Sequence, residues 1–78
     1  MPKIIIYTTP TCVYCKMAKA FFKEYNIAYE ERDVAADATA RDEMIKKSNQ
    51  MGVPVIDIEG QIITGFDKNR LADLLSVK

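Results

Sequence analysis

The spacing of apolar residues divides the chain into alternating predicted strands and helices. Residues 3–8 form a nearly continuous apolar run, which is typical of a strand covered on both faces. A helical pattern follows over Val13–Tyr25, and Asn26 is its expected end. One face of this helix is predicted to carry Met17, Ala18, Phe21, Phe22 and Tyr25, and Phe21 and Phe22 are expected in the core.

The middle of the chain continues this alternation. A weaker pattern at Ala28–Val34 predicts a second strand, and Asp37 is expected to cap a helix that ends near Ser48. The charged residues 30–33 and the pair Lys46–Lys47 are expected on solvent-exposed surfaces. The buried face of the second helix is predicted to carry Ala40, Met44, Ile45 and Ser48.

The last third of the chain predicts a hairpin and a helix. Val53–Ile58 and Gln61–Thr64 are the two strands, and Glu59-Gly60 is the tight turn between them. A last helix is expected after Asp67. Its apolar residues are Leu71, Leu74, Leu75 and Val77.

Composition narrows the classes of function. The 78 residues carry 11 basic and 11 acidic side chains, so no excess of positive charge favours nucleic-acid binding. No apolar run approaches the roughly 18 residues of a membrane span. Met1–Lys3 leads into the first strand without the layout of a signal peptide, so we expect a cytoplasmic location, one domain over residues 1–78 and a monomer. Histidine is absent, so a Cys–His hydrolase would lack its usual base.

Two cysteines, Cys12 and Cys15, lie where the first strand gives way to the first helix. Two cysteines cannot complete a four-ligand zinc site in one chain, so no metal site is expected. A disulfide between them closes too small a loop to stabilise the fold strongly. Free N–H groups and the dipole at a helix start stabilise a thiolate, which is the attacking species in thiol chemistry. The pair therefore indicates redox chemistry.

The predicted order of elements is β-α-β-α-β-β-α. Strands joined by helices favour parallel pairing with a right-handed crossover, and the last two strands form an antiparallel hairpin. The expected fold class is α/β, with a four-stranded mixed sheet and helices on both faces. This is the thioredoxin-like arrangement, and a C-x-x-C pair beside a βαβ pattern is typical of it.

Three short elements resemble the glutaredoxin family. Thr11-Cys12-Val13-Tyr14-Cys15 resembles its T-C-P-Y-C active site, Gly52-Val53-Pro54 its T-V-P element, and Thr64-Gly65-Phe66-Asp67 its G-G-x-D element. The three elements have the family's order and spacing, and the resemblance spans essentially the whole chain. It implies a dithiol thiol-disulfide oxidoreductase that reduces protein disulfides or glutathione mixed disulfides, with glutathione as co-substrate.

Three departures from the family pattern leave the reductant open. Val13 replaces a proline, Thr9 replaces a frequent lysine, and Thr64 replaces the first of two glycines. Val13 and Gly65-Phe66 resemble instead the glutaredoxin-like redoxins that thioredoxin reductase recycles and that donate electrons to ribonucleotide reductase. Another alternative is an iron–sulfur carrier, in which Cys12 of two chains and glutathione hold a 2Fe–2S cluster. The last alternative is a purely structural domain in which the C-x-x-C pair has no chemical role.

The two cysteines are expected to have different roles. Cys12 lies nearer the helix start, so it is the expected nucleophile and the more exposed sulfur. Cys15, one turn further along, is expected to attack Cys12 and release the reduced substrate. Lys16 and Lys19 are expected to add positive charge nearby.

The remaining site residues follow from the resemblance. It implies a cis bond between Val53 and Pro54, with the N–H and C=O groups of Val53 free to pair with an extended substrate. It also implies that the amides of Phe66 and Asp67 hold the γ-glutamyl carboxylate of glutathione and that the Asp67 carboxylate holds its ammonium. The alternatives are a trans proline, a simple helix cap at Asp67 and a simple turn at Gly65. The other two candidate binding residues are Thr9 and Tyr14.

Overall fold

A computed structural model describes residues 3–76 of the chain. Its elements are β1 (Ile4–Thr8), α1 (Val13–Glu24), β2 (Glu30–Asp33), α2 (Ala38–Ser48), β3 (Val55–Ile58), β4 (Gln61–Thr64) and α3 (Lys68–Leu75), in the predicted order. β2 and β3 are shorter than predicted, because residues 28–29, 34 and 53–54 lie outside the strand ladders. Val77, which was expected on the last helix, lies outside the described residues.

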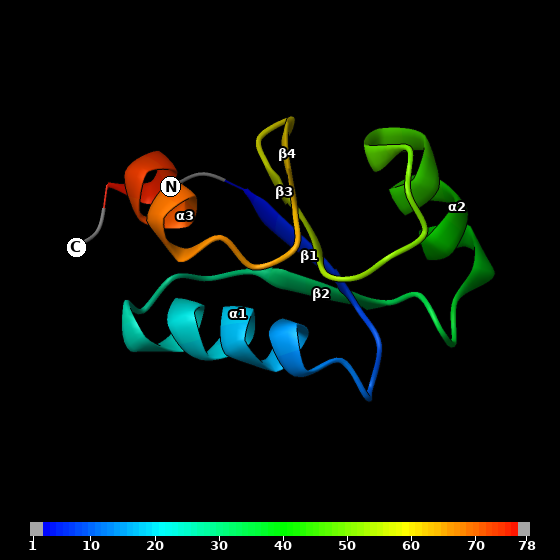
Figure 1. The fold of residues 1–78 in the computed structure, drawn as a ribbon, viewed down its shortest axis with the longest axis horizontal. Helices are drawn as coiled ribbons and strands as arrows, with labels where there is room; N and C mark the ends of the chain where they lie inside the picture. Colours follow the sequence, from blue (N-terminus) through cyan, green and yellow to red (C-terminus); the bar gives the residue numbers. More distant parts are fainter. Residues whose placement is uncertain (1–2, 77–78) are drawn as a thin grey trace.

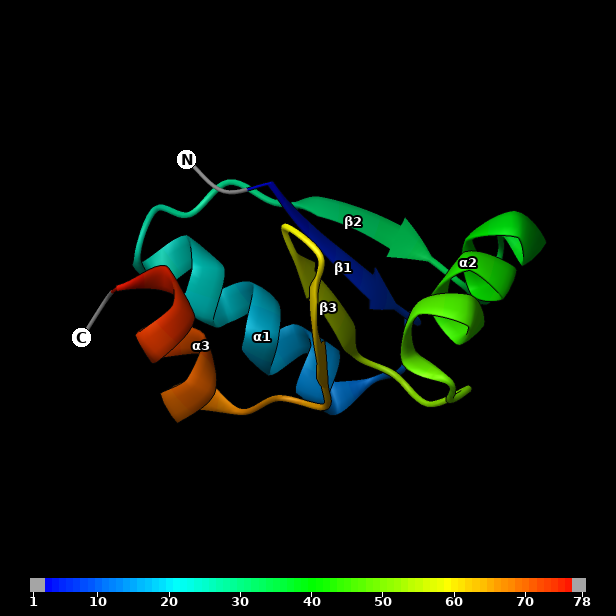
Figure 2. The same cartoon turned by 90° about the horizontal axis from the view of Figure 1, so that it is seen from above.

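The four strands form one mixed sheet in the order β2-β1-β3-β4, as expected (Figure 1). β1 pairs with β2 in parallel, while the β1–β3 and β3–β4 pairs are antiparallel. Tyr7 lies opposite Val55, and Val55 lies opposite Thr64. The end of β1, the beginning of β3 and the end of β4 therefore meet at one edge of the sheet (Figure 2).

Helices cover both faces of the sheet, which confirms the predicted layers (Figure 2). α1 and α3 pack on one face, and α2 packs on the other. Alternate β1 residues point to opposite faces, so Ile4 and Ile6 join the α1/α3 side while Ile5 and Tyr7 join the α2 side. Buried residues on the helices themselves are Cys15, Ala18, Phe21, Phe22, Ala40, Met44 and Leu71.

The apolar face of α1 is buried at its centre and exposed at its flank. Phe21 and Phe22 are buried as predicted, whereas Met17 is 45% exposed. Met17 instead lines a groove together with Phe66. The spacing of apolar residues alone does not separate the centre of a helix face from its flank.

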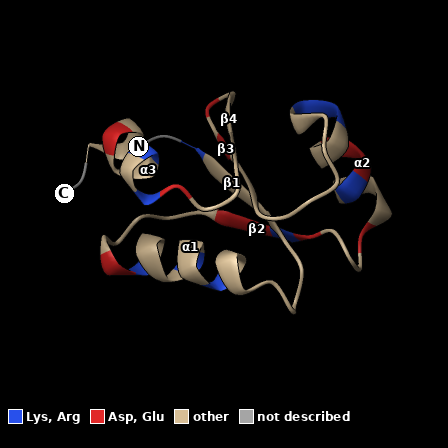
Figure 3. Cartoon of the chain, viewed as in Figure 1, with Lys and Arg blue, Asp and Glu red and all other residues tan. Residues whose placement is uncertain are grey.

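Lys47 was expected on an exposed surface, and that expectation is wrong. Its Nζ donates hydrogen bonds to Asp57 Oδ2 at 2.7 Å and to Tyr7 Oη at 2.8 Å, and lies 3.3 Å from Glu43 Oε1. Burial opposes the charge on Lys47, but these partners outweigh burial and raise its pKa. Burial likewise disfavours the Asp57 carboxylate, but Lys47 and the Gly60 N–H lower its pKa on balance. Charges of both signs intermingle along β2 and α2 (Figure 3).

Candidate active site

Cys12 is the N-cap of α1. Its backbone is extended, with φ −85° and ψ 112°, and its Sγ accepts a hydrogen bond from the Cys15 N–H at 3.1 Å. The Cys12 N–H donates to the Thr9 carbonyl at 3.3 Å, which closes the turn between β1 and the helix. The sulfur therefore takes the place of the side-chain oxygen that usually satisfies a free N–H at a helix start.

Cys12 and Cys15 are joined by a disulfide, with 5.2 Å between their Cα atoms. Cys15 is fully buried, while Cys12 is half-buried. A substrate disulfide can therefore reach Cys12 from solvent more easily than Cys15. This difference in exposure agrees with the predicted roles, which themselves remain a prediction.

Lys19, which was expected to add positive charge near the cysteines, forms an ion pair with Glu31. Its Nζ lies 2.9 Å from Glu31 Oε2, and the same oxygen accepts a hydrogen bond from Thr8 Oγ1 at 2.9 Å. The hydrogen bond from Lys19 lowers the pKa of Glu31; burial opposes this shift, and Thr8 adds to it. Sequence reasoning missed Glu31, because only the parallel pairing of β1 and β2 brings it beside the end of β1.

The bond between Val53 and Pro54 is cis, which confirms the prediction. Pro54 is buried, and its carbonyl accepts a hydrogen bond from the Gly65 N–H at 2.8 Å. Outside the strand ladders, no backbone hydrogen bond among residues 3–76 involves Val53. The structure thus joins two of the predicted binding elements directly and leaves the Val53 peptide groups available to a partner.

Asp67 is the N-cap of α3, and its Oδ1 accepts a hydrogen bond from the Arg70 N–H at 3.1 Å. The simple cap function is therefore confirmed, and any role in glutathione binding would be additional. Gly65 has a φ of +76°, a conformation that favours glycine, so the simple turn function is also confirmed. Phe66 is half-buried, with its ring 6.2 Å from that of Phe21.

The predicted site residues all lie on the three segments that leave the sheet at the same edge. Tyr14 is 61% exposed in the first turn of α1, beside the disulfide. The segments contribute Thr9, Cys12, Tyr14 and Cys15; Val53 and Pro54; and Gly65, Phe66 and Asp67. What each of these residues binds remains a prediction.

Two further properties of the described part of the chain bear on function. Within residues 3–76, no three or more His, Cys, Asp or Glu side chains gather as a metal site would require. A cluster shared between two chains is a different arrangement, which this observation does not test. None of the helices in the same range combines the length and the apolar character that crossing a membrane demands.

A C-x-x-C pair at disulfide distance, at a helix start of a thioredoxin-like fold, defines a thiol-disulfide oxidoreductase. The family model described as Glutaredoxin matches residues 4–63. The chain therefore belongs to the glutaredoxin family.

Individual relatives agree with this assignment. A glutaredoxin-like 8.6 kDa protein from the rubredoxin operon of Clostridium pasteurianum is 47% identical over 72 residues, which cover 92% of this chain and 96% of that protein. Glutaredoxin 3 of Escherichia coli is 40% identical over 67 residues, or 86% of this chain and 81% of the relative. The thioredoxin-like protein BC3987 has a similar structure, with a TM-score of 0.87 and 39% identity over 92% of this chain and 99% of that one.

Proposed function

We propose that the protein reduces disulfides through a cycle in which Cys12 attacks and Cys15 resolves. The Cys12 thiolate attacks one sulfur of the substrate disulfide, forms a Cys12–substrate disulfide and expels the other substrate sulfur as a thiolate. The Cys15 thiolate then attacks Cys12 Sγ and expels the bound substrate thiolate. The substrate gains two electrons, and the protein is left with the Cys12–Cys15 disulfide.

The position of Cys12 Sγ at the N-cap of α1 is the observation that carries this proposal. The Cys15 N–H already points at the sulfur at 3.1 Å in the disulfide form. On reduction, the same N–H and the helix dipole favour the anionic sulfur over the protonated one. Such an environment lowers a cysteine pKa from about 8.5 into the range of roughly 3.5–7.5. Cys12 would then attack at neutral pH, while buried Cys15 waits behind it.

The loop before β3 supports binding of an extended substrate. Val53 has an N–H and a C=O group outside the ladders, and it leaves the sheet at the edge where Cys12 emerges. A substrate segment that pairs with these two groups would lie as a short added strand next to the sulfur. Tyr14 and Thr9 flank the same opening from the α1 side.

Glutathione is the reductant and co-substrate that we propose. Phe66 and the N-cap Asp67 precede α3, and their N–H groups suit a carboxylate, while the exposed Asp67 carboxylate suits an ammonium. The similarity to glutaredoxin 3 of Escherichia coli over 86% of the chain supports the same reading. Glutathione mixed disulfides on proteins would then be substrates as well.

Thioredoxin reductase is the alternative reductant, and one observation favours it. Thr9 is uncharged where glutaredoxins often have lysine, and Lys19 pairs with Glu31, so neither position offers a free cation to the carboxylates of glutathione. Under this alternative Asp67 would serve only as a cap, and ribonucleotide reductase would be a candidate electron acceptor.

NADPH consumption by the oxidised protein separates the two reductants. One reaction contains glutathione with glutathione reductase, and the other contains thioredoxin reductase. We expect turnover in the first. Turnover in the second alone would contradict the glutathione proposal while keeping the Cys12–Cys15 cycle. Failure of both, with iron in anaerobically purified protein, would support the carrier of a 2Fe–2S cluster instead.

Replacing Cys15 tests the order of the two cysteines. Cys15→Ser is expected to accumulate a stable disulfide between Cys12 and the substrate, detected by intact mass, since no second thiolate can release it. The matched Cys12→Ser variant should form no such adduct. An adduct on Cys15 in the second variant and none in the first would reverse the assigned roles, and no adduct in either would favour a structural domain.

A further inference from the structure

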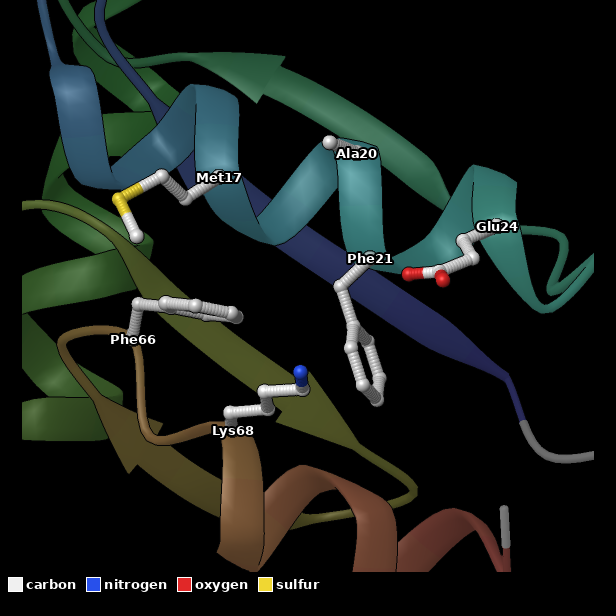
Figure 4. A pocket seen from close by; sticks show the side chains of 6 residues that line it. All are labelled: Met17, Ala20, Phe21, Glu24, Phe66 and Lys68. Carbon is white, nitrogen blue, oxygen red and sulfur yellow. The ribbon is translucent and has the colours of Figure 1, made fainter. Parts of the chain in front are cut away.

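An apolar groove runs between α1 and the segment that leads into α3. It has a volume of about 280 Å³, and its lining residues are Met17, Ala20, Phe21, Glu24, Phe66 and Lys68. Met17 and Phe66 face one another across it (Figure 4), and Phe21 is buried. The volume lies just below the roughly 300–1,000 Å³ of typical small-molecule sites, so the groove suits one or two side chains.

The groove continues the surface around Cys12. Val13 and Met17 are 66% and 45% exposed and lie one helical turn apart on the same side of α1 as Ala20. An apolar strip therefore leads from the reactive sulfur into the groove. Met17 lies about 7.5 Å beyond Cys12 along the helix, and Ala20 about 12 Å beyond it.

The charges at the rim do not favour an ionic occupant. Glu24 and Lys68 bring one negative and one positive charge to the opening, while Met17, Phe21 and Phe66 form apolar walls (Figure 4). A neutral apolar side chain fits such a site better than an anion does, since a carboxylate that gains from Lys68 is opposed by Glu24.

We infer that this groove, called here the α1–α3 groove, binds an apolar side chain of polypeptide substrates, two to four residues from the cysteine that Cys12 attacks. An extended chain advances about 3.3 Å per residue, which matches the 7.5–12 Å span from Cys12 to the groove. Glutathione carries no apolar side chain beside its cysteine, so it would not fill the groove. The inference rests on the proposed attack by Cys12 and adds a preference among protein disulfides.

Synthetic peptides test the inference with the reduced, full-length protein. Each peptide carries one cysteine in a mixed disulfide with thionitrobenzoate. Leucine stands three residues before or after that cysteine, and asparagine replaces leucine in the matched peptides. Thionitrobenzoate leaves more readily than the peptide thiol, so Cys12 attacks the peptide sulfur and release of the coloured thiolate reports the step. Rates with free glutathione correct for the intrinsic reactivity of each peptide.

At least one leucine peptide should react about tenfold faster than its asparagine partner, because burying part of a leucine side chain favours binding in the transition state. Met17→Gln should reduce this preference to about twofold and leave the asparagine rates unchanged. Ala20→Gln, which narrows the groove, should do the same. The matched Ala38→Gln, on the opposite face of the sheet, should retain the full preference.

Three other outcomes would each contradict the groove inference. Equal rates for leucine and asparagine peptides would overturn the groove inference and leave the Cys12 cycle intact. No release from any peptide would overturn the cycle and the inference with it. A concentration-dependent dimer that Met17→Gln dissociates, measured by sedimentation, would overturn the inference by assigning the groove to a second copy of the chain.

Discussion

The first turns of α1 and α2 use the same capping geometry with different atoms. Cys12 and Asp37 both have extended backbones, and each side chain accepts a hydrogen bond from the N–H three residues later, at 3.1 Å and 3.2 Å. The Asp37 carboxylate keeps this role whatever the redox state. The Cys12 sulfur caps its helix and, in the proposed cycle, is also the reacting atom. The comparison teaches that a helix cap becomes a reactive site when its acceptor atom can form a new bond.

Replacing the N-cap residue of α1 should abolish disulfide reduction without changing the stability of the fold. We expect this to be the largest effect on activity among the variants. Cys12→Ser keeps a favoured cap residue but lacks a nucleophilic sulfur. Disulfide reduction should fall by at least about a thousandfold. The free energy of unfolding, measured by urea titration, should stay within about 0.5 kcal/mol of the reduced wild type. A serine variant that retains activity would contradict the central role of the sulfur.

The other end of α2 is held by the half-buried ammonium of Lys47. Lys47→Met leaves Asp57 without its cation and should cost about 2 kcal/mol of unfolding free energy. The matched Lys46→Met, on the exposed side of the same helix, should change stability by less than about 0.5 kcal/mol. Disulfide reduction at 25 °C should persist in both variants, and equal stabilities for the two would refute the importance of this contact.

The same contact predicts a dependence of stability on pH. The pKa of Asp57 lies below its ordinary value of 3.8, so the unfolded chain binds more protons at low pH than the folded protein. The contribution of this carboxylate is complete above about pH 4 and is lost as pH falls through the lowered pKa.

Unfolding free energies of the wild type and Asp57→Asn between pH 2 and pH 5 check this dependence. The variant should show a shallower slope, by at most about 1.4 kcal/mol per pH unit. Glu31 and Glu43 also have lowered pKa values, so part of the wild-type slope should remain. Identical slopes would show that Asp57 is protonated alike in both states.

Asp37→Ala removes the carboxylate cap of α2 and should cost about 1 kcal/mol of stability with no effect on disulfide reduction. Asp42→Ala, an exposed position inside the same helix, is the matched control. Thermal unfolding of both variants and their turnover with one disulfide substrate provide the measurement. A loss of turnover in Asp37→Ala at unchanged stability would contradict a purely structural role for the N-cap of α2.

The first turn of α3 tests the intermediate case, in which a carboxylate both caps a helix and binds a ligand. Asp67→Asn keeps a good cap, so stability should change little. If Asp67 holds the ammonium of glutathione, the KM for glutathione should rise about fivefold, through loss of a charge-assisted hydrogen bond at an exposed site. Asp73→Asn, later in α3, should leave that KM unchanged. An unaltered KM for glutathione in Asp67→Asn would show that Asp67 serves only as the helix cap.

Local features of the site were predictable from the sequence. The C-x-x-C pair at a helix start, the caps Asp37 and Asp67, and the hairpin turn at Glu59-Gly60 each depend on residues within one turn of chain. The cis bond before Pro54 was also predicted, but only through the resemblance to glutaredoxins. Short-range hydrogen bonds and allowed backbone angles determine such features, so a single segment carries enough information.

Contacts between distant segments were decided by the tertiary structure. Lys47 contacts Tyr7, 40 positions away in the sequence, and Glu31 contacts Thr8, 23 positions away. The residues next to Lys47 and Glu31 in the sequence therefore do not indicate these partners. Met17 shares an apolar helix face with the buried Phe21, and only the position of Phe66 shows that it lines a groove. Apolar spacing establishes that a helix has a buried face, but the register of the sheet and the docking of the next helix decide what covers each residue. The hydrogen-bond acceptors near the cysteines, the hydrogen-bond network under α2 and the α1–α3 groove all depend on this register and this docking.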